Sequence, residues 1–124
     1  MRFERFEDIF AWQKAKILTV NVYKTFKNSK DFGFKDQIQR ASVSIMNNIA
    51  EGFDRQTNKE FAQYLYIAKA SCSEVRSMLY LSEEISELGK NELDHLLNQT
   101  VEISKILTGL IKSIKQRKEL GTKH

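Results

Sequence analysis

Apolar residues recur every three or four positions along most of this chain, and glycines separate the stretches in which they do so. That spacing is the period of an α-helix, in which such positions share one face. The chain contains no proline that would break a long helix. The pattern predicts helices over residues 8–28, 34–53, 57–88 and 91–118, with Gly33, Gly52, Gly89 and Gly121 dividing the chain.

The fourth predicted helix carries an apolar stripe in which spacings of four and three alternate, as in knobs-into-holes packing. Its members are Leu96, Thr100, Ile103, Leu107, Leu110 and Ile114. At the start of the third, Thr57 and Glu60 have the spacing of a capping box, in which each side chain accepts from the other residue's amide. Four amphipathic helices joined by short turns predict an all-α, antiparallel, up-and-down four-helix bundle. Residues 1–124 would form this single domain, with a short flexible C-terminal tail.

The third predicted helix is apolar on two sides, whereas a helix in a lone four-helix bundle needs one broad apolar face. One row consists of Phe61, Leu65, Ala68, Cys72, Val75 and Leu79. The other consists of Ile67, Ala70, Met78, Leu81, Ile85 and Leu88. A surplus apolar face marks an interface between proteins, so we expect a homo-oligomer with the second row as its interface. The alternative is a wide core groove that takes both rows, and the sequence leaves open which row faces the core.

A row of polar residues runs along the second predicted helix beside its apolar face. It consists of Gln37, Arg40, Ser44, Asn48 and Glu51. We expect these side chains to form a polar layer between helices or subunits that fixes their register. A buried Arg40 would need a carboxylate, and Glu74 on the third helix is the expected partner, because Glu51 lies about three turns away. The rival hypothesis is a catalytic or ligand site made of Arg40, Asn48, Glu51 and Glu74, which no histidine, metal set or activated nucleophile accompanies.

Composition narrows the classes of protein further. A chain of 124 residues is long enough for one core, and no apolar run approaches the roughly 20 residues that span a bilayer. The first ten residues lack the pattern of a secretory signal, so we expect a cytoplasmic protein without a membrane partner. Cys72 lies in an apolar row and is expected to be a buried small hydrophobe. His95 and His124 lack metal-ligand spacing, and no phosphate-binding glycine loop is present, so we expect neither metal nor cofactor.

The charge distribution offers a route to a partner. The net charge is +4, and the sequence pI is about 9.2. Residues 1–50 hold nine basic and five acidic side chains, residues 51–90 five and seven, and residues 91–124 six and four. The first and fourth helices therefore supply the positive surface, which favours polyanions. The candidates for attracting nucleic-acid phosphates are Lys14, Lys16, Lys24, Lys27, Lys112, Lys115, Arg117 and Lys118. The alternative is a solvated face that keeps the protein soluble.

The chain also resembles a known family at specific positions. The first are Phe6, Asp8, Ile9, Trp12, Gln13 and Ala15, and the densest matches are Gln37, Ile38, Arg40, Ala41, Ser44, Ile45, Asn48, Ile49, Ala50, Glu51 and Gly52. Further matches are Phe61, Ala68, Ser71 and Glu74. These residues resemble the four-helix-bundle proteins encoded in intervening sequences of bacterial 23S ribosomal RNA genes. The accessory variability determinant proteins of diversity-generating retroelements are similar to that family. Ala70 stands where the family has glycine and Cys72 where leucine is common, which are packing changes.

This resemblance implies a four-helix protomer that assembles into a homopentamer, and a role connected with nucleic acid. In the retroelement relatives the basic surface is associated with RNA or DNA and with a partner reverse transcriptase. The leading hypothesis is therefore a non-catalytic oligomeric module that binds RNA or DNA through its backbone, as accessory to a nucleic-acid enzyme. The alternatives are a protein-interaction scaffold with no nucleic-acid role and, third, an enzyme that uses the polar row.

Overall fold

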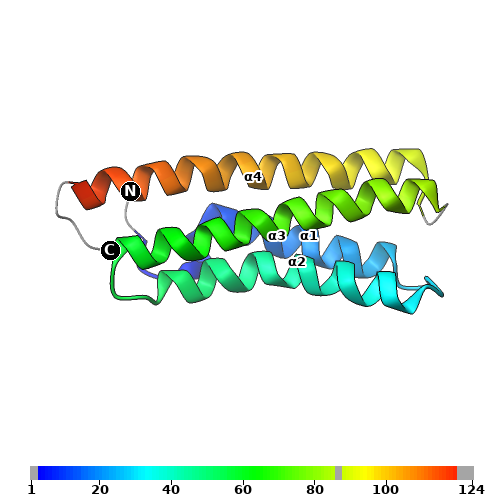
Figure 1. Ribbon diagram of the computed structural model, residues 1–124, viewed down its shortest axis with the longest axis horizontal. Helices are drawn as coiled ribbons and strands as arrows, with labels where there is room; N and C mark the ends of the chain where they lie inside the picture. The colour runs from blue at the N-terminus through cyan, green and yellow to red at the C-terminus, as the bar shows by residue number, and fades with distance from the viewer. Residues whose placement is uncertain (1–2, 86–87, 120–124) are drawn as a thin grey trace.

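Four long helices lie side by side in the computed structural model, which describes residues 3–85 and 88–119 (Figure 1). They are α1 (Phe10–Thr25), α2 (Phe32–Phe53), α3 (Asn58–Glu84) and α4 (Lys90–Glu119), preceded by a 3-10 turn, η1 (Phe6–Asp8). The described residues contain no strand. None of the helices described is long and apolar enough to cross a membrane. The all-helical fold predicted from the sequence is confirmed.

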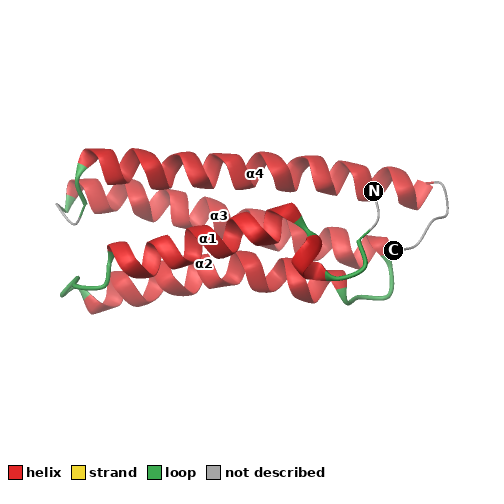
Figure 2. Cartoon of the chain, turned by 180° about the vertical axis from the view of Figure 1, so that it is seen from behind, coloured by secondary structure: helices red, strands yellow, loops and turns green. Residues whose placement is uncertain are grey.

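Each helix runs antiparallel to the one before it, and α4 packs back against α1 (Figure 2). Hydrogen bonds also link neighbouring helices. The Thr19 hydroxyl of α1 donates to the Ser42 carbonyl of α2 at 3.1 Å, and the Cys72 thiol of α3 donates to the Thr100 carbonyl of α4 at 3.2 Å. The helices therefore follow one another around the bundle in chain order, which is the up-and-down topology.

Local sequence sets the helix ends, which lie within four residues of the predicted ones. Thr57 caps α3 as expected, since its hydroxyl accepts from the Glu60 amide at 3.1 Å. The same hydroxyl donates to the Glu60 carboxylate at 3.3 Å, a contact that differs from the expected capping box, in which the carboxylate accepts from the Thr57 amide. The first helix starts at Phe10 rather than residue 8, because the η1 turn and the extended Ile9 precede it. Gly33 does not separate two helices. It lies in the first turn of α2, whose N-cap is Asp31.

The buried residues show which row of α3 faces the core. Phe61, Leu65, Ala68, Cys72, Val75 and Leu79 are all buried, as is the whole stripe of α4 from Leu96 to Ile114. Of the second row, Ile67, Ala70, Leu81 and Ile85 are exposed. The expectation of an interface position is wrong for the other two members, because Met78 is buried and Leu88 packs partly against the core. The core groove is thus wider than one row of α3 but does not take both.

Cys72 is a buried thiol, and burial raises its pKa to about 11, against 9.0 for an ordinary thiol. The charge of Arg76 opposes this shift to a smaller extent. The reactive thiolate is therefore almost absent near neutral pH. Above pH 9 the unfolded chain loses a proton that the folded chain keeps, so this group lowers stability as the pH rises from about 9 to 11.

We expect Cys72 to resist alkylation by iodoacetamide at pH 8 in the native protein and to react rapidly in 6 M guanidinium chloride. Mass spectrometry of both samples measures this difference. Native labelling as fast as in the unfolded chain would contradict the buried, protonated thiol.

Candidate nucleic-acid interface

A basic groove lies between α3 and α4, which Figure 1 shows running beside each other. Its lining consists of Tyr66, Lys69, Thr108, Ile111, Lys112, Lys115 and Gln116, around a volume of about 360 Å³. Lys115 Nζ donates to Tyr66 Oη at 2.9 Å and lies 5.0 Å from the centroid of that ring. We call these seven residues the basic groove.

Carboxylates are absent from the helix segments that form this groove. The sequence of α3 has none between Glu60 and Glu74, and that of α4 has none between Glu102 and Glu119. Three lysines share the groove, and neither wall carries an acid at their level to neutralise them. Like charges held in a concave surface raise the local positive potential, which attracts polyanions.

The sequence-based lysine candidates do not form one surface. Lys112 and Lys115 line the groove. Lys24 and Lys27, by contrast, are exposed at the opposite end of the bundle, because α1 runs antiparallel to α4. Lys14 forms an ion pair with Glu102 at 3.5 Å, so its charge is already partly neutralised.

Of the three remaining candidates for phosphate binding, Lys16 and Arg117 do not line the groove. Lys16 is exposed, and its ammonium lies 5.6 Å from the centroid of the Trp12 ring. Arg117 is half-buried, and the side chain of Lys118 lies outside the described residues.

Of the groove residues that sequence reasoning missed, Tyr66 and Lys69 are the two on α3. Helix α3 lies in the segment from residue 51 to residue 90, where acidic side chains outnumber basic ones, so the charge distribution did not point to its lysines. The available signal was the acid-free run from residue 61 to residue 73, with Tyr66 and Lys69 three positions apart on it.

The predicted polar row follows the contact between α2 and α3. Ser44 Oγ lies 2.9 Å from Ser71 Oγ, and Asn48 Nδ2 donates to the carbonyl of Ser44 at 2.8 Å and to its hydroxyl at 3.0 Å. Further along, Gln37 Nε2 donates to Glu74 Oε2 at 3.2 Å. Ser44, Asn48 and Ser71 are half-buried, so the centre of the row links the two helices. Gln37, Glu51 and Glu74 are exposed.

The expected pair between Arg40 and Glu74 is wrong. Arg40 Nε donates to Asp36 Oδ2 at 2.9 Å, one turn back on the same helix, and its side chain is 79% exposed. An exposed guanidinium is hydrated and needs no buried carboxylate, so the reason for expecting Glu74 does not apply. Arg40, Asn48, Glu51 and Glu74 therefore do not converge on a shared cavity.

The outward residues of α3 form an exposed apolar row beside this polar one. Ile67 and Leu81 are each 49% exposed, and Ile85 is 41% exposed. They share a stripe with Ser71, Glu74 and the buried Met78, since successive members are then three or four residues apart. Because Ser71 and Glu74 bond to α2, this stripe lies on the α2 side of α3. We call Ile67, Leu81 and Ile85 the exposed α3 row.

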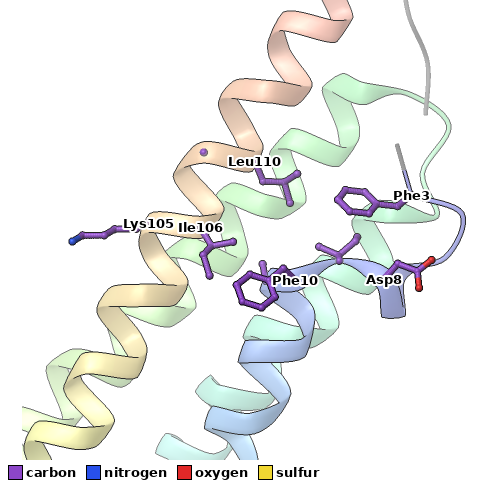
Figure 3. A pocket seen from close by; sticks show the side chains of 9 residues that line it. Phe3, Asp8, Phe10, Lys105, Ile106 and Leu110 are labelled. Carbon is purple, nitrogen blue, oxygen red and sulfur yellow. The ribbon is translucent and has the colours of Figure 1, made fainter. Parts of the chain in front are cut away.

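A second apolar surface lies over α1 and α4. Phe3, Ile9, Phe10, Ala11, Ile106, Gly109 and Leu110 line most of a groove of about 540 Å³, with Asp8 and Lys105 at its edge. Figure 3 shows the Phe3, Phe10, Ile106 and Leu110 side chains around it, while Lys105 and Asp8 extend away from it. Phe10 is 53% exposed, and Ile17, two turns along α1, is 49% exposed. The described bundle therefore leaves apolar side chains uncovered on two different sides.

Comparison with known proteins gives a family and a structural relative. The model of the 23S rRNA-intervening sequence protein matches residues 7–109. The chain is also similar to the crystal structure of a protein of unknown function from the S23 ribosomal protein family of Bacteroides thetaiotaomicron VPI-5482. The two are 27% identical with a TM-score of 0.77, and the match covers 82% of this chain and 98% of the other. No curated protein matches the chain.

The matched segment contains the whole of α1, α2 and α3 and most of α4. It also contains the motif from Gln37 to Gly52 on which the resemblance was based. The chain belongs to the 23S rRNA-intervening sequence protein family.

Proposed function

We propose that this protein is a non-catalytic homo-oligomeric module that binds the backbone of RNA or DNA through the basic groove. The observation that carries the proposal is the set of three lysines, Lys69, Lys112 and Lys115, on two helix walls free of carboxylates. Ammonium groups bind phosphates as point charges and release condensed counterions, which requires no reading of base sequence.

Self-association follows from the two uncovered apolar surfaces. The exposed α3 row lies on the α2–α3 side of the bundle, and the groove around Phe10 lies on the α1–α4 side. Exposed large apolar side chains gathered on one side of a protein are typical of protein interfaces. Two unlike surfaces on different sides of a protomer suit a head-to-tail contact, which generates a ring when the rotation closes. This argument favours a ring of copies over a two-fold dimer, and a pentamer is the state expected for the family.

A ring would strengthen weak binding by each groove. Five copies of a chain with a net charge of +4 carry +20. Once one groove holds a strand, the others meet it at a high effective concentration, so affinity rises without any new contact. A nucleic-acid enzyme that acts on the bound strand is the expected further partner.

A protein-interaction scaffold is the second candidate, and the apolar groove around Phe10 favours it. In that case the groove would accept a side chain from another protein, and the lysines would serve solubility. Catalysis by the polar row is not part of the proposal, because Arg40 forms its ion pair on the outer surface of α2.

Reversing two charges in the groove tests the proposal. We expect Lys112→Glu/Lys115→Glu to weaken binding of a labelled 30-nucleotide RNA at least tenfold at 50 mM salt. The slope of log K against log salt should also become shallower by roughly 1.4–1.8, since each phosphate contact contributes about 0.7–0.9. Fluorescence anisotropy across a salt series measures both quantities.

Lys24→Glu/Lys27→Glu is the matched control, because it changes the net charge by the same amount at the opposite end of the bundle. This control should lose less than threefold in affinity. An equal loss in both variants would reject the groove as the site. Failure of the wild-type protein to bind RNA or DNA at 50 mM salt would reject nucleic-acid binding itself.

A further inference from the structure

The basic groove contains an aromatic ring as well as cations. Tyr66 is 46% exposed and stands among Lys69, Lys112 and Lys115 on the groove lining. Lys115 Nζ is 2.9 Å from the Tyr66 hydroxyl but 5.0 Å from the ring centroid. These distances place the ammonium beyond the hydroxyl end of the ring. The lysine therefore contacts the polar tip of the tyrosine rather than the centre of its ring, and we infer that the exposed part of the ring can accept a stacked base.

We propose that the basic groove selects single-stranded nucleic acid over duplex, with one unpaired base stacked on the Tyr66 ring and the adjoining phosphates on the three lysines. The inference rests on the proposed function and adds the class of strand that the groove accepts. Aromatic side chains beside a cationic track are the usual platform for single strands, because every base presents a π-face whatever its sequence.

The size of the groove favours a single strand for a second reason. Its volume of about 360 Å³ is near the lower end of the range for small-ligand sites, so it holds roughly one nucleotide. In a duplex the base faces are stacked on one another, and a side chain at the groove wall cannot reach them. A duplex would therefore contact the outer lysines alone and would gain nothing from Tyr66. The ribose 2′-hydroxyl plays no part in this contact, so single-stranded RNA and DNA should bind alike.

The experiment compares 15-nucleotide single-stranded RNA, single-stranded DNA and duplex DNA of one sequence at 100 mM salt. We expect both single strands to bind about tenfold more tightly than the duplex. Tyr66→Leu should weaken single-strand binding about tenfold and leave duplex binding within twofold, which removes the preference. Tyr66→Phe retains the ring and should retain the preference. A single 2-aminopurine in the DNA strand reports stacking directly, and we expect its fluorescence to fall on binding to the wild-type protein but not to Tyr66→Leu.

Tyr80→Leu is the matched control. Tyr80 lies fourteen residues further along α3, on the same flank, is 49% exposed and does not line the groove. The Tyr80→Leu protein should bind all three oligonucleotides as the wild type does. Circular dichroism verifies that every variant is folded. Equal binding of single strands and duplex, with both weakened by Lys112→Glu/Lys115→Glu, would overturn the single-strand inference while leaving the proposed function intact. Absence of binding to any oligonucleotide would overturn both.

Discussion

Gly52→Ala is expected to lower the melting temperature by roughly 5–15 °C, which corresponds to about 1–3 kcal/mol for a chain of this size. Gly52 is buried in the last turn of α2, where that helix lies close to the first turns of α3. A Cβ atom at this position would lie 2.5 Å from Cβ of Tyr64 and 3.1 Å from Cδ1 of Phe61. A Cβ atom is fixed to its backbone, so no rotamer change of Tyr64 relieves the first contact, and the two helices must separate.

Gly33→Ala is the control for helix propensity. Gly33 is exposed in the first turn of α2, and a Cβ atom there would meet only Asp31 Oδ1 at 3.8 Å, an ordinary van der Waals contact. Alanine is favoured over glycine in a helix by up to about 1 kcal/mol, so this variant should be as stable as the wild type or more stable. Thermal unfolding followed by circular dichroism measures both variants. A Gly52→Ala protein at least as stable as the wild type would show that the close approach of α2 and α3 is wrong.

The substitution Leu81→Lys/Ile85→Lys is expected to dissociate the proposed oligomer into folded protomers. Leu81 and Ile85 are 49% and 41% exposed in the single chain, so lysine at these positions costs the protomer little. In an assembly the same positions would be covered, and a lysine there would bury an unpaired charge, which costs several kcal/mol. Burying two such charges in each contact would cost more free energy than a typical interface can offset. Helical content by circular dichroism should stay unchanged while the sedimenting mass falls.

Tyr80→Lys is the control that distinguishes the effect of a lysine at the proposed interface from the effect of added charge elsewhere on α3. Tyr80 is adjacent to Leu81 and equally exposed at 49%, but it points about 100° away around α3. We expect this variant to keep the wild-type mass. If Tyr80→Lys dissociates the protein and Leu81→Lys/Ile85→Lys does not, the interface has been assigned to the wrong flank of α3.

Periodicity was sufficient to predict the helices and the inward stripe of α4, because burial repeats along a helix at a fixed interval. That stripe, from Leu96 to Ile114, is buried as predicted, whereas periodicity alone gave two apolar rows on α3 and left open which of them faces the core. The Thr57 cap was predictable because it depends on residues three positions apart. The sequence placed Gly52 at the end of α2 but did not reveal its close contact with Tyr64, because a glycine near a helix end has the same pattern whether it ends the helix or makes room for a neighbouring one.

The features that sequence reasoning missed depend on how helices rotate against one another. The expectation of a Glu74 partner supposed a buried Arg40, but this side chain is 79% exposed and pairs with Asp36 one turn away on the same helix. Tyr66 and Lys69 join the site only because their flank of α3 meets α4. The separation of Lys24 from Lys112, by contrast, followed from the predicted topology. Antiparallel helices place the end of the first beside the start of the fourth.

Charge and assembly depend on one another in this account. Under the proposed function, the groove with its three lysines would bind a strand weakly and salt-sensitively in a single protomer, whereas several grooves in one particle would bind it jointly. The Leu81→Lys/Ile85→Lys protein adds positive charge, so electrostatics alone predicts tighter RNA binding for it. Loss of multivalency predicts weaker binding, and the sign of the change identifies which effect dominates.

Sedimentation velocity of the wild-type chain at micromolar concentration in 150 mM salt tests the central claim most directly. We predict one species with several times the 14.5 kDa mass of the chain, which Leu81→Lys/Ile85→Lys converts to 14.5 kDa. A wild-type protein that sediments only at 14.5 kDa across this range would show that the exposed α3 row and the groove around Phe10 remain uncovered in solution, which contradicts the account.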